Sequence, residues 1–519
     1  MKRKVLVCLF AIAVIAAAAG GLIAYNTYES SNTADNKNVA GVETETVEAS
    51  TEYNELSVKT DWDEMASISI DGDNVTIEGS GCTESDGVIT ITDGGLYTIT
   101  GSSDDCQIVV NSEENVKIVL NGVTLTNDDG PVIYGAQVKN LYIEMTEGTT
   151  NTLTDGTAYA VDDAGEDIGK AVISCEDDLI ILGDGELIIN SNYKHGIASD
   201  DKLYIESGTI TITSAVVDGI HANDLVCIDG GTIDITATSD IMESEDMLVV
   251  NGGTINGTSS DEGLEAKGNL YINGGYIDIA TEDDGLNAGT AIEINDGTLY
   301  ITATVGDAID ANGNYDGCIT INGGLVYAMG GSNPEGGIDA DMASAYINGG
   351  TVIIIGDVNS SISESSEAIS LVYGSFSAGE TIGILDADGN TVFAIEPTVS
   401  GTTMIISTPE IQAGETYTIY TGGTISGNSD AYGYYSDGEY SGGTSVMEVT
   451  ADSQVVEAGG SASGMNGMMG GQGGRGQTGE MPSDGESSSD GQMPQMNGKG
   501  GPGGNMGASG NMDNQSTTQ

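Results

Sequence analysis

The chain has 519 residues and carries 80 aspartates and glutamates against 13 lysines and arginines, which gives a formal net charge of −67. Because no arginine occurs between Arg3 and Arg475, the clustered basic residues that phosphate contacts need are missing, and nucleic acid is excluded as a partner. Acids that are dispersed over a surface serve solubility, whereas acids that are gathered in one place require cations.

The N-terminus has the pattern of an export segment. A basic head at residues 1–4 is followed by an unbroken apolar run at residues 5–19. Residues 1–28 are therefore predicted to be a signal peptide or an uncleaved membrane anchor, and both remain open. In either case we expect an extracellular protein, secreted or held at the cell surface by this segment alone. Residues 29–60, rich in Ser, Thr, Asn and Glu, are predicted to form a polar linker.

A sequence repeat organises the chain from about residue 183 to residue 350. Each copy reads apolar-x-apolar, an Asn-Gly-Gly-like turn, apolar-x-apolar, then an acid and a glycine. The glycines that close the turns are spaced 22 to 27 residues apart: Gly185, Gly208, Gly231, Gly253, Gly275, Gly297, Gly324 and Gly350. Units of this length with alternating apolar residues and no helical period predict a β-solenoid. We therefore predict an all-β fold in which residues 61–370 form a right-handed parallel β-helix with coils of about 22 residues.

Three columns of apolar residues recur at fixed positions of the repeat and are predicted to point inward. The first precedes the turn glycines: Ile205, Ile228, Val250, Ile272, Ile294, Ile321 and Ile347. The second follows them: Ile210, Ile212, Ile233, Ile235, Ile277, Ile279, Leu299, Ile301, Val352 and Ile354. The third lies after the acidic turn: Ile197, Ile220, Met242, Leu264, Leu286, Ile309 and Ile338. Three inward strands in each coil predict a three-sided tube in which each residue packs on its copy in the next coil.

A polar column beside the turn glycines is predicted to be structural. Its members are Glu206, Asp229, Asn251, Asn273, Asn295, Asn322 and Asn348. Asparagine side chains bond neighbouring groups at turns, so stacked copies should form a ladder that ends the strands. We expect no binding role for this column.

The strand pattern changes after Ile369. Residues 371–445 are predicted to form a small antiparallel β cap, with a hairpin signal at Asp388-Gly389 between two apolar runs. Residues 446–519, rich in Gly, Met and Ser, are predicted to be a disordered tail.

Five cysteines follow the N-terminal segment, and no CxxC pair occurs among them. This odd number indicates neither a disulfide framework nor a zinc site. Cys82 and Cys106 lie about one coil apart, so a disulfide between them and two free thiols are both open.

The acids are gathered at one turn of the repeat. One column holds Asp218, Asp240, Glu262, Asp284 and Asp307, and a second column three residues later holds His221, Glu243, Glu265, Asn287, Asp310 and Asp339. Two carboxylates about 5 Å apart repel by about 3 kcal/mol at an effective dielectric constant near 20, so a ladder of them needs cations. Calcium accepts mixed oxygen ligands in loose geometry, whereas transition metals prefer more histidine than His195 and His221 offer. The predicted calcium ligands are Asp218, Asp240, Glu243, Glu262, Glu265, Asp284, Asn287, Asp307, Asp310 and Asp339.

Two alternatives to a calcium site remain. The acidic turn could be solvated, with its charge partly neutralised by Lys194, Lys202 and Lys267. Aromatic residues could instead present a platform for sugar rings, but the outward column is not a continuous aromatic strip: Tyr204, Cys227, Val249, Tyr271, Glu293, Thr320 and Tyr346. A denser group fits packing within the cap better than sugar binding: Tyr417, Tyr420, Tyr432, Tyr434, Tyr435 and Tyr440. No substrate-binding residue is assigned.

Several motifs together resemble one family of exported bacterial proteins. They are NTLTDG at residues 151–156, CEDDLII at 175–181, GDGEL at 183–187 and HGIASDD at 195–201, with the repeated Asp-Gly-Ile motif. From about residue 61 to residue 424 the chain resembles the carbohydrate-binding domain family with a right-handed parallel β-helix, similar in fold to pectate lyases. The resemblance implies a calcium-binding protein that binds plant cell-wall polysaccharides, including acidic ones, with calcium ligands on the acidic turn.

These observations favour a calcium-dependent polysaccharide-binding protein without catalysis. Calcium could bridge protein and uronate carboxylates, and polygalacturonate or cellulose are the polymers considered; we expect a monomer. A pectate-lyase-like β-eliminase is the alternative, and it needs a base beside calcium. Lys267 is the best remaining candidate for that base, with Lys194 and Lys202 behind it, although a lysine beside acids is also an ordinary charge partner. A structural surface adhesin is a third possibility.

Overall fold

The computed structural model describes residues 58–460 apart from a few positions inside this range, which are residues 163, 314, 332–334, 342 and 357–359. Every helix or strand in these ranges is a β-strand, which confirms the all-β prediction. The predicted export segment, nearly all of the predicted linker and residues 461–519 lie outside the described residues. The part of the chain that the structure describes has no helix with the length and apolar character needed to cross a membrane.

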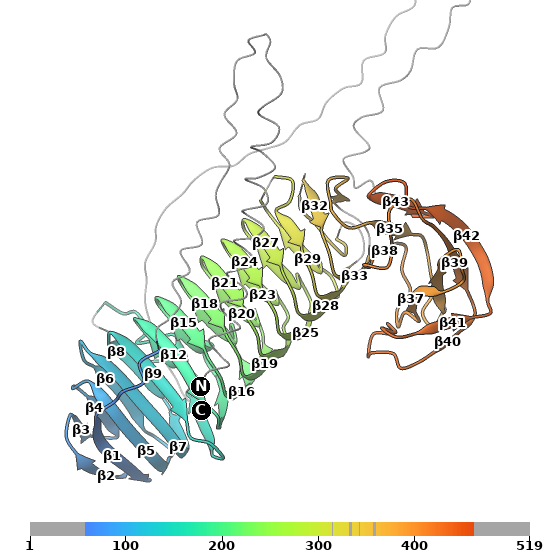
Figure 1. The fold of residues 1–519 in the computed structure, drawn as a ribbon. Coiled ribbons are helices and arrows are strands. Elements are labelled where there is room, and N and C mark those ends of the chain that lie inside the picture. The colour runs from blue at the N-terminus through green and yellow to red at the C-terminus, as the bar shows by residue number, and fades with distance from the viewer. Residues whose placement is uncertain are drawn as a thin grey trace, which may run out of the picture. The chain divides into compact units, whose positions relative to one another are not determined.

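Most of the strands belong to three series, in each of which a strand pairs in parallel with its counterpart in the next coil (Figure 1). The first series comprises β9 (Asn140–Met145), β12 (Asp178–Gly183), β15 (Lys202–Ile205), β18 (Leu225–Ile228), β21 (Met247–Val250), β24 (Asn269–Ile272), β27 (Ala291–Ile294), β30 (Ile319–Ile321), β32 (Ser344–Ile347) and β34 (Ser361–Ile362). The second comprises β10 (Thr150–Asp155), β13 (Glu186–Asn190), β16 (Thr209–Ala215), β19 (Thr232–Ala237), β22 (Thr254–Thr258), β25 (Tyr276–Thr281), β28 (Thr298–Ala303), β31 (Leu325–Met329) and β33 (Thr351–Ile355). The third comprises β4 (Val88–Ile91), β6 (Gln107–Asn111), β8 (Ile133–Gln137), β11 (Ala171–Cys175), β14 (His195–Ser199), β17 (Ile220–Ala222), β20 (Met242–Ser244), β23 (Leu264–Ala266), β26 (Leu286–Ala288) and β29 (Ile309–Ala311). The predicted parallel β-solenoid with three strands in a coil is therefore confirmed.

The pairing register confirms the three inward columns. Ile205 pairs with Ile228 and Ile228 with Val250 in the first series, and Ile220 pairs with Met242 in the third. All members of the three columns are buried, with exposed fractions of 0 to 4%. Full burial of one such side chain contributes about 1.5 to 3 kcal/mol, so the columns are the main source of cohesion between coils.

The coils before the regular repeat follow the same stacking with longer strands. β1 (Glu64–Asp71) forms a hairpin with β2 (Asn74–Gly79) and pairs in parallel with β5 (Gly95–Ser103). β5 pairs with β7 (Asn115–Asn127), whose first half pairs with β9 and whose second half pairs with β10. β3 (Cys82–Ser85) pairs antiparallel with β4. Parallel stacking thus begins well before the repeat becomes regular in sequence.

The predicted asparagine ladder is present. Asn273 Nδ2 donates to Asn251 Oδ1 at 2.8 Å, and Asn295 Nδ2 donates to Asn273 Oδ1 at 2.9 Å. The pattern continues from Asn322 to Asn295 and from Asn348 to Asn322, each at 2.9 Å. Because an amide side chain carries both donor and acceptor, each member satisfies its two neighbours. The column is therefore structural, as predicted.

Steric constraints explain why glycine occupies the turn positions beside this ladder. Gly231 has a φ of 94°, and a Cβ placed on it would lie 2.8 Å from the carbonyl oxygen of Gly208 in the preceding coil. A side chain would meet both the left-handed backbone and the neighbouring turn, so only glycine fits.

Antiparallel strands follow the parallel coils, as predicted for the cap. β33 pairs antiparallel with β38 (Met404–Ser407), which also pairs with β35 (Ser370–Tyr373). A four-stranded sheet has the order β37 (Thr391–Ile395), β36 (Ile382–Leu385), β39 (Thr416–Thr421) and β42 (Thr444–Thr450), and β40 (Thr424–Ser426) pairs with β41 (Glu439–Ser441). The hairpin predicted at Asp388-Gly389 joins β36 to β37.

The predicted start of a disordered tail at residue 446 is wrong. β42 continues to Thr450, and β43 (Val455–Ala458) pairs in parallel with β35. Val449 and Val456 are each 8% exposed and pack in the core of the cap. The Gly- and Met-rich composition farther along the chain concealed this short alternating run.

The structure also decides two smaller points about cysteines and tyrosines. None of the five described cysteines is in a disulfide, so Cys82 and Cys106 are not bonded to each other. In the outward column considered for sugar stacking, Tyr204 is 3% exposed and cannot offer a ring face to solvent. Tyr417 and Tyr440 of the tyrosine group are buried, which confirms packing in the cap for these two.

Candidate functional site

Two aligned columns of polar residues at the start of the third strand series form what we call the acidic edge. The turn column consists of Asp218, Asp240, Glu262, Asp284 and Asp307, and the strand column consists of His221, Glu243, Glu265, Asn287, Asp310 and Asp339. Glu243 pairs in register with Glu265, and Asn287 with Asp310. The alignment of the strand column is thereby confirmed, while its role in holding metal stays a prediction.

The turn column binds the backbone of the next coil. Asp218 Oδ1 accepts the N–H of Asp240 at 3.2 Å, and Asp240 Oδ1 accepts the N–H of Glu262 at 3.0 Å. Farther along, Asp284 Oδ1 accepts the N–H of Asp307 at 2.7 Å. One oxygen of each of these carboxylates is thus fixed by the scaffold, which orients the second oxygen toward its neighbours.

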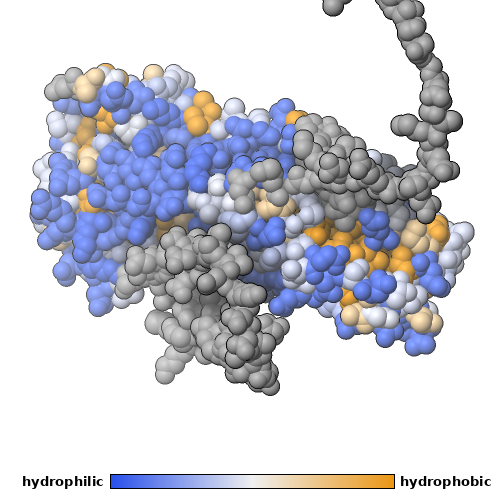
Figure 2. Space-filling view, turned by 90° about the horizontal axis from the view of Figure 1, so that it is seen from above, coloured by the Kyte–Doolittle hydropathy of each residue, from blue (hydrophilic) through white to orange (hydrophobic). Residues whose placement is uncertain are grey.

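The acidic edge is more buried than an ordinary surface turn. The exposed fractions are 1% for Asp218, 3% for Asp240, 4% for Asp307 and 6% for Glu265. Hydrophilic residues cover most of the visible solenoid surface in Figure 2. The acidic edge differs from that surface because its carboxylates are removed from water, where charge is costly.

Burial and mutual repulsion hold the protons on these carboxyl groups. Burial is the largest cause that raises the pKa values of Asp240 and Asp307, reinforced by contacts with neighbouring carboxylates. Burial and nearby negative charges raise the pKa of Asp284 to about 7 and that of Asp310 to about 8. Near neutral pH such groups are either protonated or bound to a cation that takes the place of the proton.

Asp240, Glu262 and Glu265 form one group of converging carboxylates. Each offers one oxygen, and the three oxygens lie within 4.8 Å of one another. Asp261, Glu262 and Asp283 meet the same limit in a more exposed position. Calcium coordinates six to eight oxygens at about 2.3 to 2.6 Å, so oxygens this close can share one ion. The donor set, made only of oxygen, fits calcium.

Three lysines were predicted to neutralise the acidic edge: Lys194, Lys202 and Lys267. Of these, Lys267 forms ion pairs with the edge. Lys267 Nζ lies 2.6 Å from Glu265 Oε1 and 3.1 Å from Glu243 Oε1. Lys194 instead pairs with Asp167 at 2.8 Å. The ion pairs of Lys267 compensate two carboxylates of the strand column.

The same ion pairs affect whether Lys267 can act as a catalytic base. Partial burial lowers its pKa, but the two glutamates outweigh burial and raise the pKa above the ordinary lysine value. A general base must be neutral when it takes a proton, so this environment disfavours the role. Lys202, a weaker candidate for the base, lies near Asp178, whose pKa burial raises and the lysine charge lowers only in part.

His195 extends the turn column by one coil, which the sequence analysis did not recognise. The pairing of Ile197 with Ile220 places His195 one coil before Asp218. Its ring stacks on that of His221, with centroids 4.7 Å apart and an interplanar angle of 24°. The spacing of 23 residues between His195 and Asp218 equals that of the neighbouring turn glycines. This spacing is the sequence feature that could have placed His195 in the column.

Charge at this end of the acidic edge is compensated. Burial lowers the pKa of His221, but the carboxylates of Asp218 and Glu243 beside it raise it to about 9. Burial raises the pKa of Asp218, and the contacts with His195 and His221 lower it below the usual range. The first coils of the edge therefore pair cationic with anionic groups.

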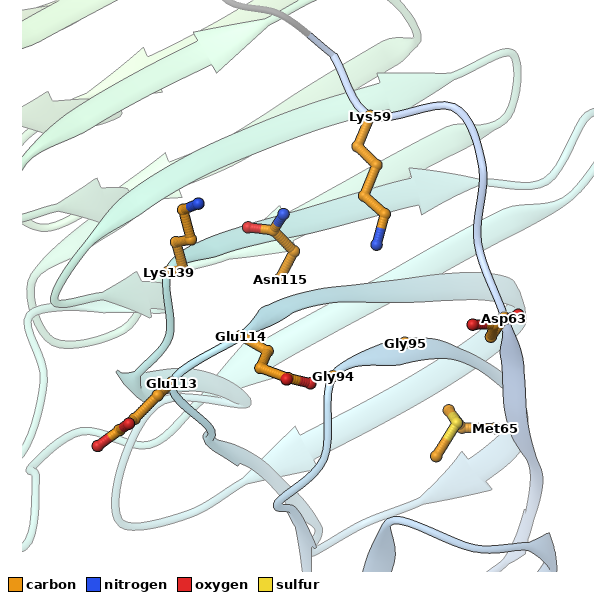
Figure 3. A pocket seen from close by; sticks show the side chains of 9 residues that line it. All are labelled: Lys59, Asp63, Met65, Gly94, Gly95, Glu113, Glu114, Asn115 and Lys139. Carbon is orange, nitrogen blue, oxygen red and sulfur yellow. The ribbon is translucent and has the colours of Figure 1, made fainter.

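Two concave surfaces lie elsewhere on the solenoid. A polar pocket of about 380 Å³ is lined by Lys59, Asp63, Met65, Gly94, Gly95, Glu113, Glu114, Asn115 and Lys139. Figure 3 shows Lys59 on the segment that leads into β1, with Lys139 and Glu113 on turns across the pocket from it. The pocket contains none of the predicted site residues.

The second is a groove of about 380 Å³ across the outer face of β16, β19, β22 and β25. Its floor includes a column in which Asn256 Nδ2 donates to Asp234 Oδ1 at 2.7 Å. At the end of this column the Tyr432 hydroxyl donates to Asp278 Oδ1, and Tyr276 beside them is 38% exposed. Polar groups beside an exposed ring suit hydroxyl-rich ligands, so this groove is a second candidate surface for carbohydrate.

The family described as carbohydrate-binding domain-containing protein matches residues 85–283 and 244–453 of this chain, which together exceed half of its length. The chain belongs to this family. A carbohydrate-binding domain-containing protein of Acetivibrio thermocellus is 34% identical over 140 residues, which are 26% of this chain and 49% of the relative. The chain thus spans about half the length of the curated relative it matches. The polysaccharide lyase-like protein from C. thermocellum, solved as a gadolinium derivative, is 29% identical, with a TM-score of 0.43 over 50% of this chain and 100% of that one.

Proposed function

We propose that this family member binds polysaccharide outside the cell in a calcium-dependent manner and that the acidic edge holds the calcium. The observation that carries the proposal is the convergence of the Asp240, Glu262 and Glu265 oxygens within 4.8 Å of one another. Carboxylates this close repel, and calcium relieves the repulsion with oxygen ligands alone. The predicted export segment supports the extracellular location.

Calcium also explains how a strongly acidic chain holds an acidic polymer. Three protein carboxylates fill part of a coordination sphere of six to eight oxygens, which leaves positions for a uronate carboxylate or for sugar hydroxyls. The ion then lies between two anionic partners that would otherwise repel. The preferred polymer is therefore an acidic plant cell-wall polysaccharide of the polygalacturonate class.

The proposal does not include catalysis. β-Elimination beside a uronate needs a base close to the metal, and Lys267 is held protonated by Glu243 and Glu265. We expect no rise in the absorbance of unsaturated uronate products when the protein is incubated with polygalacturonate and calcium. A calcium-dependent rise that is lost in Lys267→Gln would establish a lyase instead.

Co-sedimentation with polygalacturonate and with cellulose, each with calcium or with a chelator, tests the binding proposal. We expect calcium-dependent retention on polygalacturonate that is lost in the double variant Glu262→Gln/Asp284→Asn. The matched control is Asp296→Asn, which removes one charge from an exposed turn outside the acidic edge. Retention that is the same with calcium and with chelator, or that survives in the double variant, would overturn the calcium-dependent mechanism.

The same assay separates the acidic edge from the outer groove. Tyr276→Ala removes an exposed ring whose hydroxyl donates to Asp278 of the groove, and it leaves the acidic edge intact. If polymer lies along the edge, this variant keeps calcium-dependent binding of polygalacturonate. Loss of cellulose binding in Tyr276→Ala alone would assign the groove to a neutral polymer.

A further inference from the structure

The histidines of the chain gather at one end of the acidic edge. The full sequence contains two histidines, and both lie there. Asp218 Oδ2 lies 3.0 Å from His195 Nδ1 and 3.5 Å from His221 Nδ1. Glu243 Oε2 lies 3.1 Å from His221 Nδ1 on the other side. Two imidazoles and two carboxylates therefore converge in one place.

This cluster is enclosed, and its atoms are incompletely bonded. The side chains are 14% exposed for His195, 2% for Asp218, 9% for His221 and 13% for Glu243. Asp218 Oδ2 is buried and accepts no hydrogen bond from the described residues. The backbone N–H of Asp218 is directed at His195 Nδ1 at 3.4 Å, which makes that nitrogen an acceptor. Two acceptors 3.0 Å apart need a proton or a cation between them.

The distances suit ligand atoms of one metal ion: those of His195, Asp218 and His221 lie within 4.8 Å of one another, and Glu243 contacts His221 from the next coil. Metal–ligand lengths are about 2.0 to 2.2 Å for imidazole nitrogen and carboxylate oxygen on zinc. Adjacent ligands of such an ion lie about 3.0 to 3.5 Å apart, from the same bond lengths and tetrahedral or octahedral angles. The separations of 3.0, 3.1 and 3.5 Å in the cluster fall in this interval.

We propose that His195, Asp218, His221 and Glu243 form a site for a transition-metal dication of the zinc type. Imidazole nitrogen suits zinc, whereas calcium prefers oxygen, so this end of the acidic edge differs in chemistry from the carboxylate groups farther along. The site takes Asp218 and Glu243, which the sequence assigned to calcium, for a different metal. It does not depend on whether calcium binds elsewhere on the acidic edge.

The chain as it stands provides a direct test, because its two histidines can be observed without mutation. The full chain without a polyhistidine tag is labelled with ¹⁵N-histidine, treated with chelator, and titrated with Zn²⁺ in excess calcium. Both imidazole spectra are expected to shift at one equivalent of Zn²⁺ and to remain unchanged with calcium alone. Imidazole signals that ignore Zn²⁺, or that shift separately at different concentrations, would overturn the shared site.

Variants give a second test with a quantitative readout. His195→Gln and His221→Gln should each weaken Zn²⁺ binding, measured by calorimetry, at least as much as the roughly 10- to 100-fold loss that follows removal of a second-shell partner. Asp296→Asn, outside the acidic edge, should bind Zn²⁺ as the wild type does. Equal Zn²⁺ affinity in the wild type and in both folded histidine variants contradicts the proposal. If the variants fail to fold, as judged by circular dichroism, the spectra of the wild-type histidines decide.

Calcium-dependent retention on polygalacturonate is measured on the same samples. A chain that binds calcium and polymer but no Zn²⁺ rejects this inference and keeps the proposed function. A chain that binds Zn²⁺ at the histidines but shows no calcium-dependent retention on polygalacturonate keeps the zinc site and rejects the proposed function.

Discussion

The asparagine ladder and the acidic edge are two polar columns built on the same coils with opposite chemistry. In the ladder, an amide such as Asn273 donates to one neighbour and accepts from the other, so the column is satisfied without help. In the acidic edge, carboxylates such as Asp240 and Glu262 only accept, and stacking them at the spacing of paired strands, about 4.8 Å, brings like charges together. One column therefore needs nothing from solution, and the other needs protons or cations.

The largest expected difference between the two columns appears when calcium is removed at different pH values. The pKa values of Asp284 and Asp310 are raised from 3.8 to about 7 and about 8, so the folded chain binds protons that the unfolded chain releases. Their contribution to stability is fully present below about pH 4 and is lost as pH rises through about 7 to 8. In the presence of chelator, the melting temperature should therefore fall as the pH is raised from about 4 to about 8. Calcium should restore it at about pH 8 and have little effect at about pH 5.

A melting temperature that is independent of calcium at both pH values would remove the distinction between the columns. The asparagine ladder offers no titrating group between Asn251 and Asn348 and should add nothing to the pH dependence.

Replacing one asparagine of the ladder by aspartate should place two hydrogen-bond acceptors against each other, as in the acidic edge. Asn273→Asp keeps the acceptor for Asn295 but removes the donor to Asn251 Oδ1. We expect a loss of about 1 to 2 kcal/mol in the free energy of unfolding, because an acceptor then faces an acceptor. Urea unfolding at about pH 8 measures it, with Asn273→Gln as a control that keeps the amide. No loss in Asn273→Asp would show that the ladder is only a solvated turn.

The reverse exchange should have a smaller and opposite effect. Asp307→Asn keeps the oxygen that accepts the N–H of Gly336 and removes a carboxyl group that can be buried near Asp284 and Asp339 only by keeping its proton or by meeting a cation. In chelator at about pH 8 the variant should be more stable than the wild type by about 1 kcal/mol, and it should gain less from calcium. Destabilisation of the calcium-free variant would mean that the charge of Asp307 is already compensated.

The sequence predicted the solenoid because its evidence is local and repeated. The inward column from Ile205 to Ile347 and the ladder from Asn251 to Asn348 follow from a period alone, and pairing in register confirms both. Once the period is known, the alignment of Glu243 with Glu265 follows as well.

What the sequence did not show depends on packing between coils or lies outside the repeat. The burial of Asp218 and Asp240 results from the adjacent turns and cannot be read from a single copy of the repeat. His195 was not assigned to the turn column because the column was aligned on acidic residues and its first member is an imidazole. β43 was missed because a composition dominated by glycine and methionine farther along outweighed four strand residues.

Calcium titration of the chelator-treated chain by calorimetry measures whether the acidic edge binds calcium, with Glu262→Gln/Asp284→Asn and the control Asp296→Asn measured beside the wild type. We expect calcium binding by the wild type and the control, and a loss of most of that binding in the double variant. Equal calcium binding by all three proteins, or none by the wild type, would contradict the claim that the acidic edge is built for cations.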